Sequence, residues 1–253
     1  MLRGSLVFQD YTKYHHNCFK TSISQMEGNS RLNPSLFSAR YVHLTALRDQ
    51  TLKAIQNLVA TNKHLLLVDF GCGDMPYRTI LEPMVGQYIG VDLNSNPKAE
   101  HFIDFDSKTT LPDNYADIIL SNQVLEHVDS PQGYLQEALR ILKPGGSILL
   151  STHGYWYYHP TPNDYWRWTS AGLRKIVEQE GYKINSFLGI MGLAASGLQL
   201  LQDAILLKLP KIMVPPFALL MQTGIRLFDK IHSQAQRNRD ASVYVVLAQK
   251  PLI

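Results

Sequence analysis

The stretch Leu65-Leu66-Leu67-Val68-Asp69-Phe70-Gly71-Cys72-Gly73-Asp74 decides how this chain folds. A short apolar run that ends in a carboxylate and is followed by two glycines is typical of a buried parallel strand that turns sharply into a ligand-binding loop. Because glycine has no side chain, the backbone at Gly71 and Gly73 can adopt positive φ, and a ligand can lie directly against it.

A second strand-like run, Tyr88-Ile89-Gly90-Val91, ends at Asp92. Asp92 follows Gly71 by about twenty positions, a separation that places an acidic residue at the tip of the second strand of a βαβ unit. A carboxylate there accepts hydrogen bonds from ribose hydroxyls. We therefore expect this part of the chain to bind a nucleotide-containing cofactor.

Composition narrows the class of protein. The 253 residues suffice for one large α/β domain with elaborations, and no repeat of fixed period is visible. Charged residues make up 18% of the chain, below the usual value of about 25%, which indicates extra apolar surface. A net charge of +3 without a Lys/Arg stripe argues against nucleic acid as a partner.

The N-terminus and the cysteines bear on localisation. Residues 1–20 mix charged, histidine and tyrosine side chains, and because they hold no continuous apolar segment we expect no signal peptide and a cytoplasmic protein. Only Cys18 and Cys72 are present, which excludes a disulfide framework.

Strand-like and helix-like segments alternate along the rest of the chain. A helix is expected from Thr45 to about Asn62, and another begins at Ser130-Pro131 and ends at Lys143-Pro144-Gly145-Gly146. This alternation predicts a parallel sheet with right-handed crossovers and helices on both faces. The expected strands are residues 65–69, 88–91, 101–104, 116–121, 147–152, 182–188 and 242–249.

Two regions extend this core. Residues 1–44 are expected to form an N-terminal extension over the domain of residues 45–253, and residues 189–240 an apolar helical insertion before the last strand. Neither helix of the insertion, near 191–208 and 216–232, is a convincing membrane span. One interpretation is packing against the sheet or a second copy, as a homodimer. The other is peripheral contact with the inner face of a membrane, assisted by Lys208, Lys211, Arg226 and Lys230.

Five motifs occur in order along the chain. They are Val68-Asp69-Phe70-Gly71-Cys72-Gly73, Gly90-Val91-Asp92, Leu111-Pro112-Asp113-Asn114-Tyr115-Ala116-Asp117-Ile118-Ile119, Val124-Leu125-Glu126-His127-Val128 and Leu142-Lys143-Pro144-Gly145-Gly146. Over about residues 64–188 the chain resembles class I S-adenosylmethionine-dependent methyltransferases of the type 11-like group. The resemblance implies a Rossmann-like, seven-stranded, mostly parallel sheet with an antiparallel last strand, and S-adenosylmethionine as the cofactor.

The resemblance also implies roles for individual residues. The two glycines would lie against the methionine part of the cofactor, Asp92 would bridge the ribose hydroxyls, and Asp104 would lie at the adenine. Asp69 would orient the glycine turn or reach the cofactor's amino group through water. The implied cofactor-binding residues are Asp69, Gly71, Cys72, Gly73, Asp92, Leu93, Asp104, Phe105, Asn122 and Gln123.

The turn departs from the family pattern at Met75, where a third glycine is common, and Pro76 follows. The third glycine of such turns serves close helix–strand packing, so we expect the next helix to start differently, with Pro76 at its first position. A nicotinamide-dependent oxidoreductase is the competing interpretation. It is disfavoured because the last glycine of the dinucleotide fingerprint and a reductase-type Tyr-x-x-x-Lys pair are both missing.

The loop from Ser151 to Thr169 follows the fifth strand, at the sheet edge where ligands of α/β proteins bind. Methyl transfer to a hydroxyl requires alignment of the nucleophile and removal of its proton. His153 and His159 are the candidate bases, with Asp164 as orienter or alternative base. The alternative is that these histidines only hydrogen-bond the loop and that Asp164 forms a structural ion pair with Arg167.

The same loop is rich in tryptophan and tyrosine, whose faces suit a sugar ring or a planar aromatic acceptor. Its pattern resembles methyltransferases of bacterial surface-polysaccharide clusters, which favours a sugar or glycolipid hydroxyl as the acceptor. The alternatives are an O-methyltransferase of a small aromatic or quinone-like molecule and a cofactor-binding, non-catalytic partner subunit. His127 stands alone on an expected helix, without further ligands at a recognised spacing, so we predict no metal site.

Overall fold

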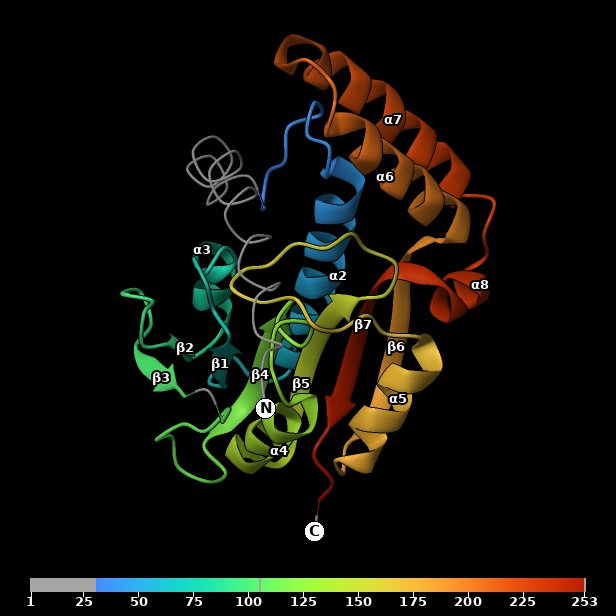
Figure 1. Ribbon diagram of the computed structural model, residues 1–253. Helices are drawn as coiled ribbons and strands as arrows, with labels where there is room; N and C mark the ends of the chain where they lie inside the picture. Colours follow the sequence, from blue (N-terminus) through green and yellow to red (C-terminus); the bar gives the residue numbers. More distant parts are fainter. Residues whose placement is uncertain (1–30, 105, 253) are drawn as a thin grey trace, which may run out of the picture.

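The computed structural model describes residues 31–104 and 106–252 (Figure 1). Seven strands form one sheet in the order β3-β2-β1-β4-β5-β7-β6, in which β7 is antiparallel to both of its neighbours. The other pairings are parallel. The predicted fold class is therefore confirmed. The strands are β1(Leu66–Phe70), β2(Gln87–Leu93), β3(His101–Ile103), β4(Ala116–Asn122), β5(Leu142–His153), β6(Lys183–Gly192) and β7(Ala241–Gln249).

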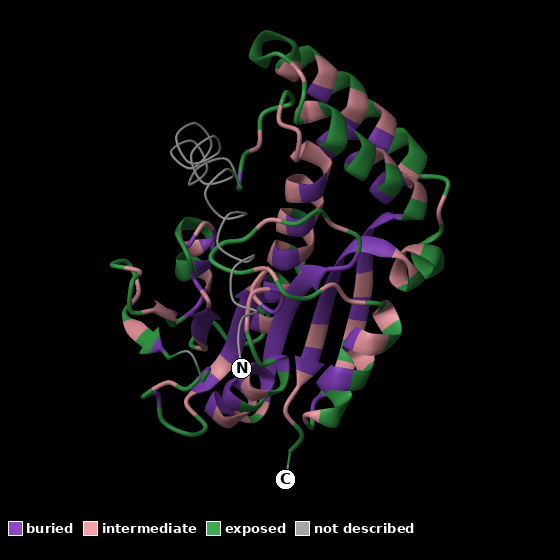
Figure 2. Ribbon diagram, in the orientation of Figure 1, coloured by how far each residue is buried: buried purple, intermediate pink, exposed green. Residues whose placement is uncertain are grey.

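Helices cover both faces of this sheet, whose central strands are almost wholly buried (Figure 2). On one face α4(Pro131–Ile141) and α5(Ser170–Gln179) bury their apolar sides against the strands. On the other face lie α2(Tyr41–Val59) and the short α3(Arg78–Leu81). The carboxyl ends of β1, β2, β4 and β5 meet at one edge because these strands are parallel, and that edge carries the predicted site residues.

Two helix starts show how local sequence sets the elements. Ser130 accepts a hydrogen bond from the amide of Gly133 (3.1 Å), so α4 has the predicted N-cap, with Pro131 at its first position. By contrast, α2 begins at Tyr41, four residues before the predicted start and inside the predicted extension. Residues 1–30 of that extension lie outside the described part of the chain.

The insertion is a hairpin of α6(Leu193–Leu206) and α7(Val214–Asp229), joined by η2(Lys211–Met213) and followed by α8(Gln234–Arg239). Residues 189–192, predicted to belong to the insertion, instead continue β6 and pair with β7. Among the helices of the described residues, none has the length and hydropathy that a membrane crossing requires.

A buried polar network fixes this hairpin to the start of α2. The side-chain amides of Gln199, Gln202 and Gln222 all donate to the carbonyl oxygen of Ala39, at 3.2, 2.8 and 2.9 Å. Arg40 pairs with Asp203 beside them. Because buried amides are costly unless they are hydrogen-bonded, this network fixes the position in which the hairpin packs against the start of α2.

Candidate active site

The glycine turn after β1 is closed by backbone hydrogen bonds to β2. The amides of Gly71 and Cys72 both donate to the carbonyl oxygen of Val91, at 2.8 and 3.0 Å. Gly71 has φ +81°, and a Cβ at this position would lie 2.6 Å from a methyl carbon of Val124. Gly73 has φ +52°, and a Cβ there would meet no described atom within 4 Å. The first glycine is thus required by packing, whereas the second leaves open space.

Asp92 links the tip of β2 to this turn. Its Oδ2 accepts hydrogen bonds from the amide of Gly73 (2.8 Å) and from Nδ2 of Asn96 (2.7 Å). Asn96 also donates to the carbonyl oxygen of Gly73 (2.8 Å), and Leu93 donates its amide to Oδ1 of Asp92 (2.8 Å). Asp92 is half-buried, so its carboxylate is fixed but still reaches solvent. Sequence reasoning missed Asn96, which lies in a polar loop without a periodic signal.

Asp69 lies on β1, two residues before Gly71 of the turn. It is buried and accepts a hydrogen bond from the hydroxyl of Tyr88 on β2. Burial raises the pKa of this carboxyl to about 7. Cys72 is also buried, and burial raises the pKa of its thiol, which disfavours a reactive thiolate.

Met75 occupies the position of the family's third glycine with φ +51°. Its side chain is accommodated by Gly90 on β2, where a Cβ would lie 2.8 Å from the Met75 sulfur. The next helix, α3, begins at Arg78, so the prediction that Pro76 is its first residue is wrong. The left-handed Met75 delays the helix because it directs the chain through a further turn before the helix can start.

The remaining predicted cofactor residues follow β3 and β4. Asp104 is exposed, and its Oδ1 accepts the amide of Lys108 (2.7 Å). Phe105 lies outside the described residues. Gln123 has φ +56°, and its amide donates to the carbonyl oxygen of Ser151 (3.0 Å). Asn122 Oδ1 accepts from the Ser151 hydroxyl (3.0 Å), so the end of β4 is tied to β5.

His153 ends β5 and lies in a buried cluster with Glu126. Its Nε2 is 3.4 Å from Oε1 of Glu126, whose other oxygen accepts the hydroxyl proton of Thr152 (2.8 Å). Burial lowers the pKa of His153 well below its ordinary value and raises the pKa of Glu126 to about 7. The imidazole is therefore neutral, with a lone pair available.

His159 lies beside this cluster and is held by Asp164. The His159 amide donates to Oδ2 of Asp164 (2.7 Å), and its ring Nδ1 lies 3.3 Å from the same oxygen. Arg167 donates to both oxygens of Asp164 at 2.6 Å. Burial opposes ionisation of Asp164, but the bonds from Arg167 and the His159 amide outweigh it and hold the pKa of this carboxyl below its usual value. The Asp164–Arg167 ion pair of the structural alternative is thus present, and Asp164 also lies beside His159. The role of Asp164 as orienter or base stays a prediction.

Residues from two other segments complete the cluster. His43 of α2 packs on Trp156, with ring centroids 4.7 Å apart, and Trp156 stacks on His153 at 4.5 Å. His127 lies in the turn between β4 and α4, so its predicted place on a helix is wrong, and its Nδ1 contacts the carbonyl oxygen of Asn163. Sequence reasoning missed His43 because it is one buried position in an amphipathic helix and resembles a core residue.

The segment 122–127 joins the two halves of the site. Val124 packs on Gly71 of the cofactor turn. Two residues later, the carbonyl oxygen of Glu126 accepts the amides of Tyr165 (2.8 Å) and Trp166 (3.2 Å) from the aromatic loop. The structure therefore brings the glycine turn and the histidine cluster together along one short stretch.

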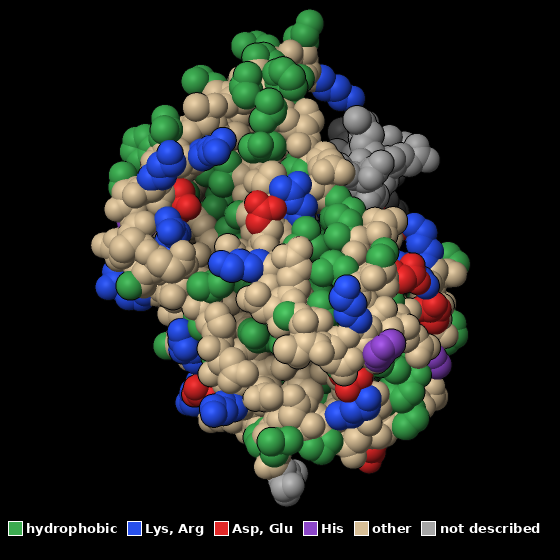
Figure 3. Space-filling model, turned by 180° about the vertical axis from the view of Figure 1, so that it is seen from behind, with side chains coloured by type: hydrophobic (Ala, Val, Ile, Leu, Met, Phe, Trp, Pro, Cys, Tyr) green, Lys and Arg blue, Asp and Glu red, His purple; other side chains and the backbone are tan. Residues whose placement is uncertain are grey.

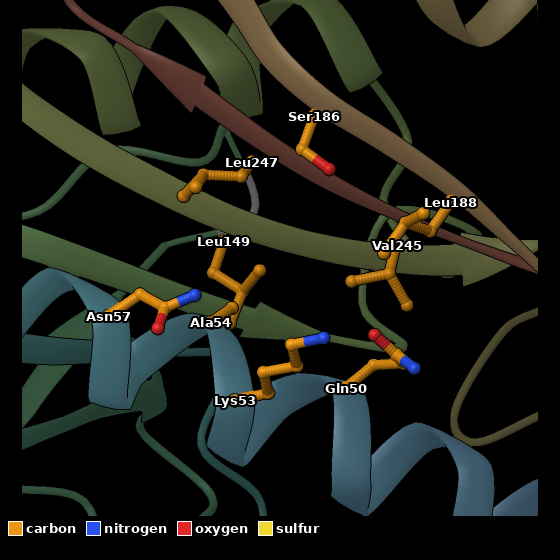
Figure 4. Close-up of a pocket in the computed structure, with 9 residues that line it drawn as sticks. All are labelled: Gln50, Lys53, Ala54, Asn57, Leu149, Ser186, Leu188, Val245 and Leu247. Atoms are coloured by element: carbon orange, nitrogen blue, oxygen red, sulfur yellow. The ribbon is translucent and has the colours of Figure 1, made fainter.

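A separate pocket of about 220 Å³ lies between α2 and strands β5, β6 and β7 (Figure 4). Gln50, Lys53 and Asn57 of α2 face apolar side chains of the strands, among them Leu149, Val245 and Leu247. The predicted site residues do not line this pocket.

Comparison with known proteins identifies the class. A family model described as a methyltransferase domain matches residues 40–184, which is more than half of the chain. The chain belongs to this methyltransferase family. The match confirms the class that the five motifs predicted.

Two mycobacterial relatives of this methyltransferase carry related names. A probable S-adenosylmethionine-dependent methyltransferase of Mycolicibacterium smegmatis is 23% identical over 139 residues, which are 49% of this chain and 54% of the relative. An uncharacterized methyltransferase of Mycobacterium leprae is 35% identical over 98 residues, which are 34% of this chain and 36% of the relative. The matched region thus spans about half or less of the length of these relatives.

Solved structures share the fold. Phosphoethanolamine N-methyltransferase 2 of Haemonchus contortus, solved with S-adenosyl-L-methionine, has a TM-score of 0.53 and 15% identity over 88% of this chain and 60% of its own. The [4+2]-cyclase SpnF has a TM-score of 0.53 and 17% identity over 81% of this chain and 82% of its own. Because one of these proteins is a cyclase, the shared fold alone does not establish methyl transfer.

Proposed function

We propose that this methyltransferase transfers a methyl group from S-adenosylmethionine to a hydroxyl of a sugar or glycolipid. The observation that carries the proposal is segment 122–127, which contacts the glycine turn through Val124 and the histidine loop through Glu126. A cofactor at the turn and an acceptor at the loop would then be adjacent, as in-line displacement requires.

The residues of the turn fit the cofactor. The open space at Gly73 allows a ligand to approach the backbone, and the half-buried Asp92 suits ribose hydroxyls. Bound there, the cofactor would supply an electrophilic methyl group on a sulfonium. The proposed binding residues remain Asp69, Gly71, Cys72, Gly73, Asp92, Leu93, Asp104, Phe105, Asn122 and Gln123, with Asn96 added as the residue that fixes Asp92.

The acceptor side rests on His153, His159 and Asp164. Burial lowers the pKa of both histidines, so neutral imidazoles face the sheet edge and offer lone pairs to an acceptor hydroxyl. Nδ1 of His159 lies 3.2 Å from the carbonyl oxygen of Tyr157 and 3.3 Å from Asp164, and these contacts orient the other ring nitrogen. The exposed rings of Tyr157, Tyr158 and Trp166 suit stacking on a sugar.

Cofactor binding and turnover test this proposal separately. Asp92→Ala is expected to weaken S-adenosylmethionine binding by about 1–3 kcal/mol in calorimetry, because charge-assisted hydrogen bonds are lost. Asp74→Ala is the matched control, since Asp74 is exposed and pairs only with Lys98 among the described residues. Unchanged affinity in Asp92→Ala would refute the ribose assignment.

Turnover is measured by transfer of a labelled methyl group to a panel of glycosides, lipid-linked sugars and catechols. His159→Ala and His153→Ala are expected to lower the rate on the preferred acceptor by about a hundredfold or more, the lower end of the range for removal of a general base. Transfer to catechols alone would favour the small aromatic acceptor. Tight cofactor binding without turnover on any acceptor would identify a non-catalytic partner subunit.

We further propose that the α6–α7 hairpin contacts an anionic phospholipid surface, in keeping with a lipid-linked acceptor at the inner face of a membrane. Hydrophobic side chains gather at this end of the molecule (Figure 3). Its two acidic residues, Asp203 and Asp229, are engaged by Arg40, Gly192 and Arg237. Lys208, Lys211, Arg226 and Lys230 pair with no acidic group of the described chain, so the hairpin presents apolar and basic groups together. The exposed apolar residues include Leu207, Ile212, Met213, Leu220, Leu227, Phe228 and Ile231.

Cosedimentation with vesicles tests the membrane contact. Binding is expected to increase when phosphatidylglycerol is added to phosphatidylcholine and to fall several-fold in the Ile212→Asp/Leu220→Asp double variant. Leu252→Asp is the matched control, because Leu252 is 81% exposed but lies near the C-terminus, away from the hairpin (Figure 1). No binding by the native chain, or equal binding by the double variant, would refute the contact. A dimer that the double variant dissociates would assign the surface to a second copy.

A further inference from the structure

Three potential metal ligands from separate segments converge beside the cofactor turn. Glu126 comes from the turn after β4, His153 from the end of β5 and His159 from the aromatic loop. One ligand atom from each lies within 4.8 Å of the others. The expectation of no metal site rested on ligand spacing along the sequence, and spacing cannot reveal ligands that only the fold brings together.

The distance within this cluster suits an ion better than a direct hydrogen bond. Glu126 Oε1 and His153 Nε2 are 3.4 Å apart, longer than the roughly 2.7–2.9 Å of a charge-assisted hydrogen bond. Tetrahedral coordination with bonds near 2.0–2.1 Å places neighbouring ligand atoms roughly 3.4 Å apart. The observed separation therefore matches the spacing of two ligands of one tetrahedral ion.

Glu126 also has an orphaned atom directed into the cluster. Its side chain is fully buried, and Oε1 has no hydrogen-bond partner among the described residues. A buried carboxylate oxygen without a partner is costly. The other oxygen is held by Thr152, so the free oxygen is fixed in its orientation toward the histidines.

The surroundings of His159 are those of a metal-binding histidine. Its Nδ1 lies 3.3 Å from Asp164, which Arg167 holds in turn, and this leaves Nε2 available to an ion. Ligating histidines commonly contact a carboxylate through their other nitrogen in this way.

We propose that Glu126, His153 and His159 bind a divalent transition-metal ion of the zinc type, with the fourth position open. Two histidines and one glutamate with an open position form a ligand set typical of catalytic zinc. An acceptor oxygen is a suitable fourth ligand. Coordination of an acceptor oxygen rests on the proposed function, whereas binding of the ion does not. When the ion is bound, the histidine lone pairs hold it, so the two histidines would position the acceptor through the ion and would not act as the general bases of the metal-free site.

Metal binding to the full chain tests the site without cofactor or acceptor. The protein is stripped with a chelator and titrated with zinc against a chromophoric competitor, and with cobalt(II) to record visible absorption. The native chain is expected to bind one ion and to show the intense absorption of four-coordinate cobalt. Glu126→Gln and His159→Asn are each expected to weaken binding at least tenfold. His64→Asn is the matched control, since His64 is an exposed histidine before β1.

Each outcome decides the proposal. No binding by the native chain overturns it, and so does binding that survives Glu126→Gln and His159→Asn, because the ion would then occupy other groups. Circular dichroism of the two variants separates loss of a ligand from loss of the fold, and His153→Gln gives a third variant if either one unfolds. Calorimetry with S-adenosylmethionine on the same preparations shows whether cofactor binding fails independently.

Discussion

The glycine turn and the aromatic loop face each other across the carboxyl edge of the sheet, but they are built in different ways. The turn at residues 71–75 is held by backbone amides that donate to Val91 and to Asp92, which lie on the neighbouring strand. The loop at residues 154–169 is held mainly through side chains, above all those of Arg167 and Asp164. The turn is therefore sensitive to changes in backbone conformation, and the loop is sensitive to changes in charge.

Because of this difference, the two halves are expected to respond differently to substitution. A turn that depends on backbone hydrogen bonds accepts many side chains, provided that the left-handed positions are preserved. A loop that depends on a buried ion pair loses its shape when one partner is removed, because the other is left without compensation. The three predictions below use single substitutions to separate these cases.

The largest effect is expected from Gly71→Ala. The new Cβ would lie 2.6 Å from a methyl carbon of Val124 at a φ of +81°. Overpacking and left-handed strain together are expected to lower the free energy of unfolding by about 3 kcal/mol. Gly73→Ala is the control, with a loss of about 1 kcal/mol, because its Cβ meets open space. Urea denaturation of both variants measures the difference, and equal losses would contradict the distinction.

Asp164→Asn is expected to have the next largest effect. The asparagine can still accept the His159 amide, but the bidentate pair with Arg167 is lost. Because the Asp164 side chain is fully buried, we expect a loss of about 2 kcal/mol in unfolding free energy and faster proteolysis within residues 154–169. Asp49→Asn is the control, because Asp49 is an exposed aspartate of α2 that pairs with Arg48 and lies outside the loop. A protease pattern identical to that of the native chain would show that the pair does not hold the loop.

The smallest expected effect is the dependence of folding stability on pH. The direction of this dependence differs between Asp69, beside the glycine turn, and Asp164, in the aromatic loop. Burial raises the pKa of Asp69 to about 7, so the folded state binds more protons than the unfolded state between about pH 4 and 7, and stability falls as pH rises through this range. The pKa of Asp164 is held below its usual value, so its contribution is present above about pH 4 and is lost as pH falls further.

Substitution of Asp69 and of Asp164 separates their contributions to the change of unfolding free energy with pH. In Asp69→Asn the decline in unfolding free energy between pH 4 and 7 is expected to flatten, whereas in Asp164→Asn the loss below pH 4 is expected to shrink. Denaturant titrations across pH on both variants and the native chain measure the slopes. A slope between pH 4 and 7 that Asp69→Asn leaves unchanged would show that another buried group, such as Glu126, controls it.

The sequence by itself determined the alternation of strands and helices and the glycine turn, and its resemblance to a known family implied the antiparallel last strand. These features depend on residues close together in the chain, such as Gly71 and Gly73, or on a fixed strand spacing, such as that to Asp92. Apolar strands, caps and glycines act locally, so their pattern can be interpreted before any tertiary contact is known. The class of enzyme followed from the order of such local motifs.

Only the tertiary structure decided how the acceptor side is assembled. His43, Glu126 and His153 are far apart in the chain and carry no shared spacing, yet α2, the turn after β4 and the end of β5 bring them to one cluster. The same holds for Ala39, whose carbonyl gathers glutamines from α6 and α7. Long-range packing places these groups, and burial then sets their charge states, so their chemistry depends on surroundings that the local sequence does not contain.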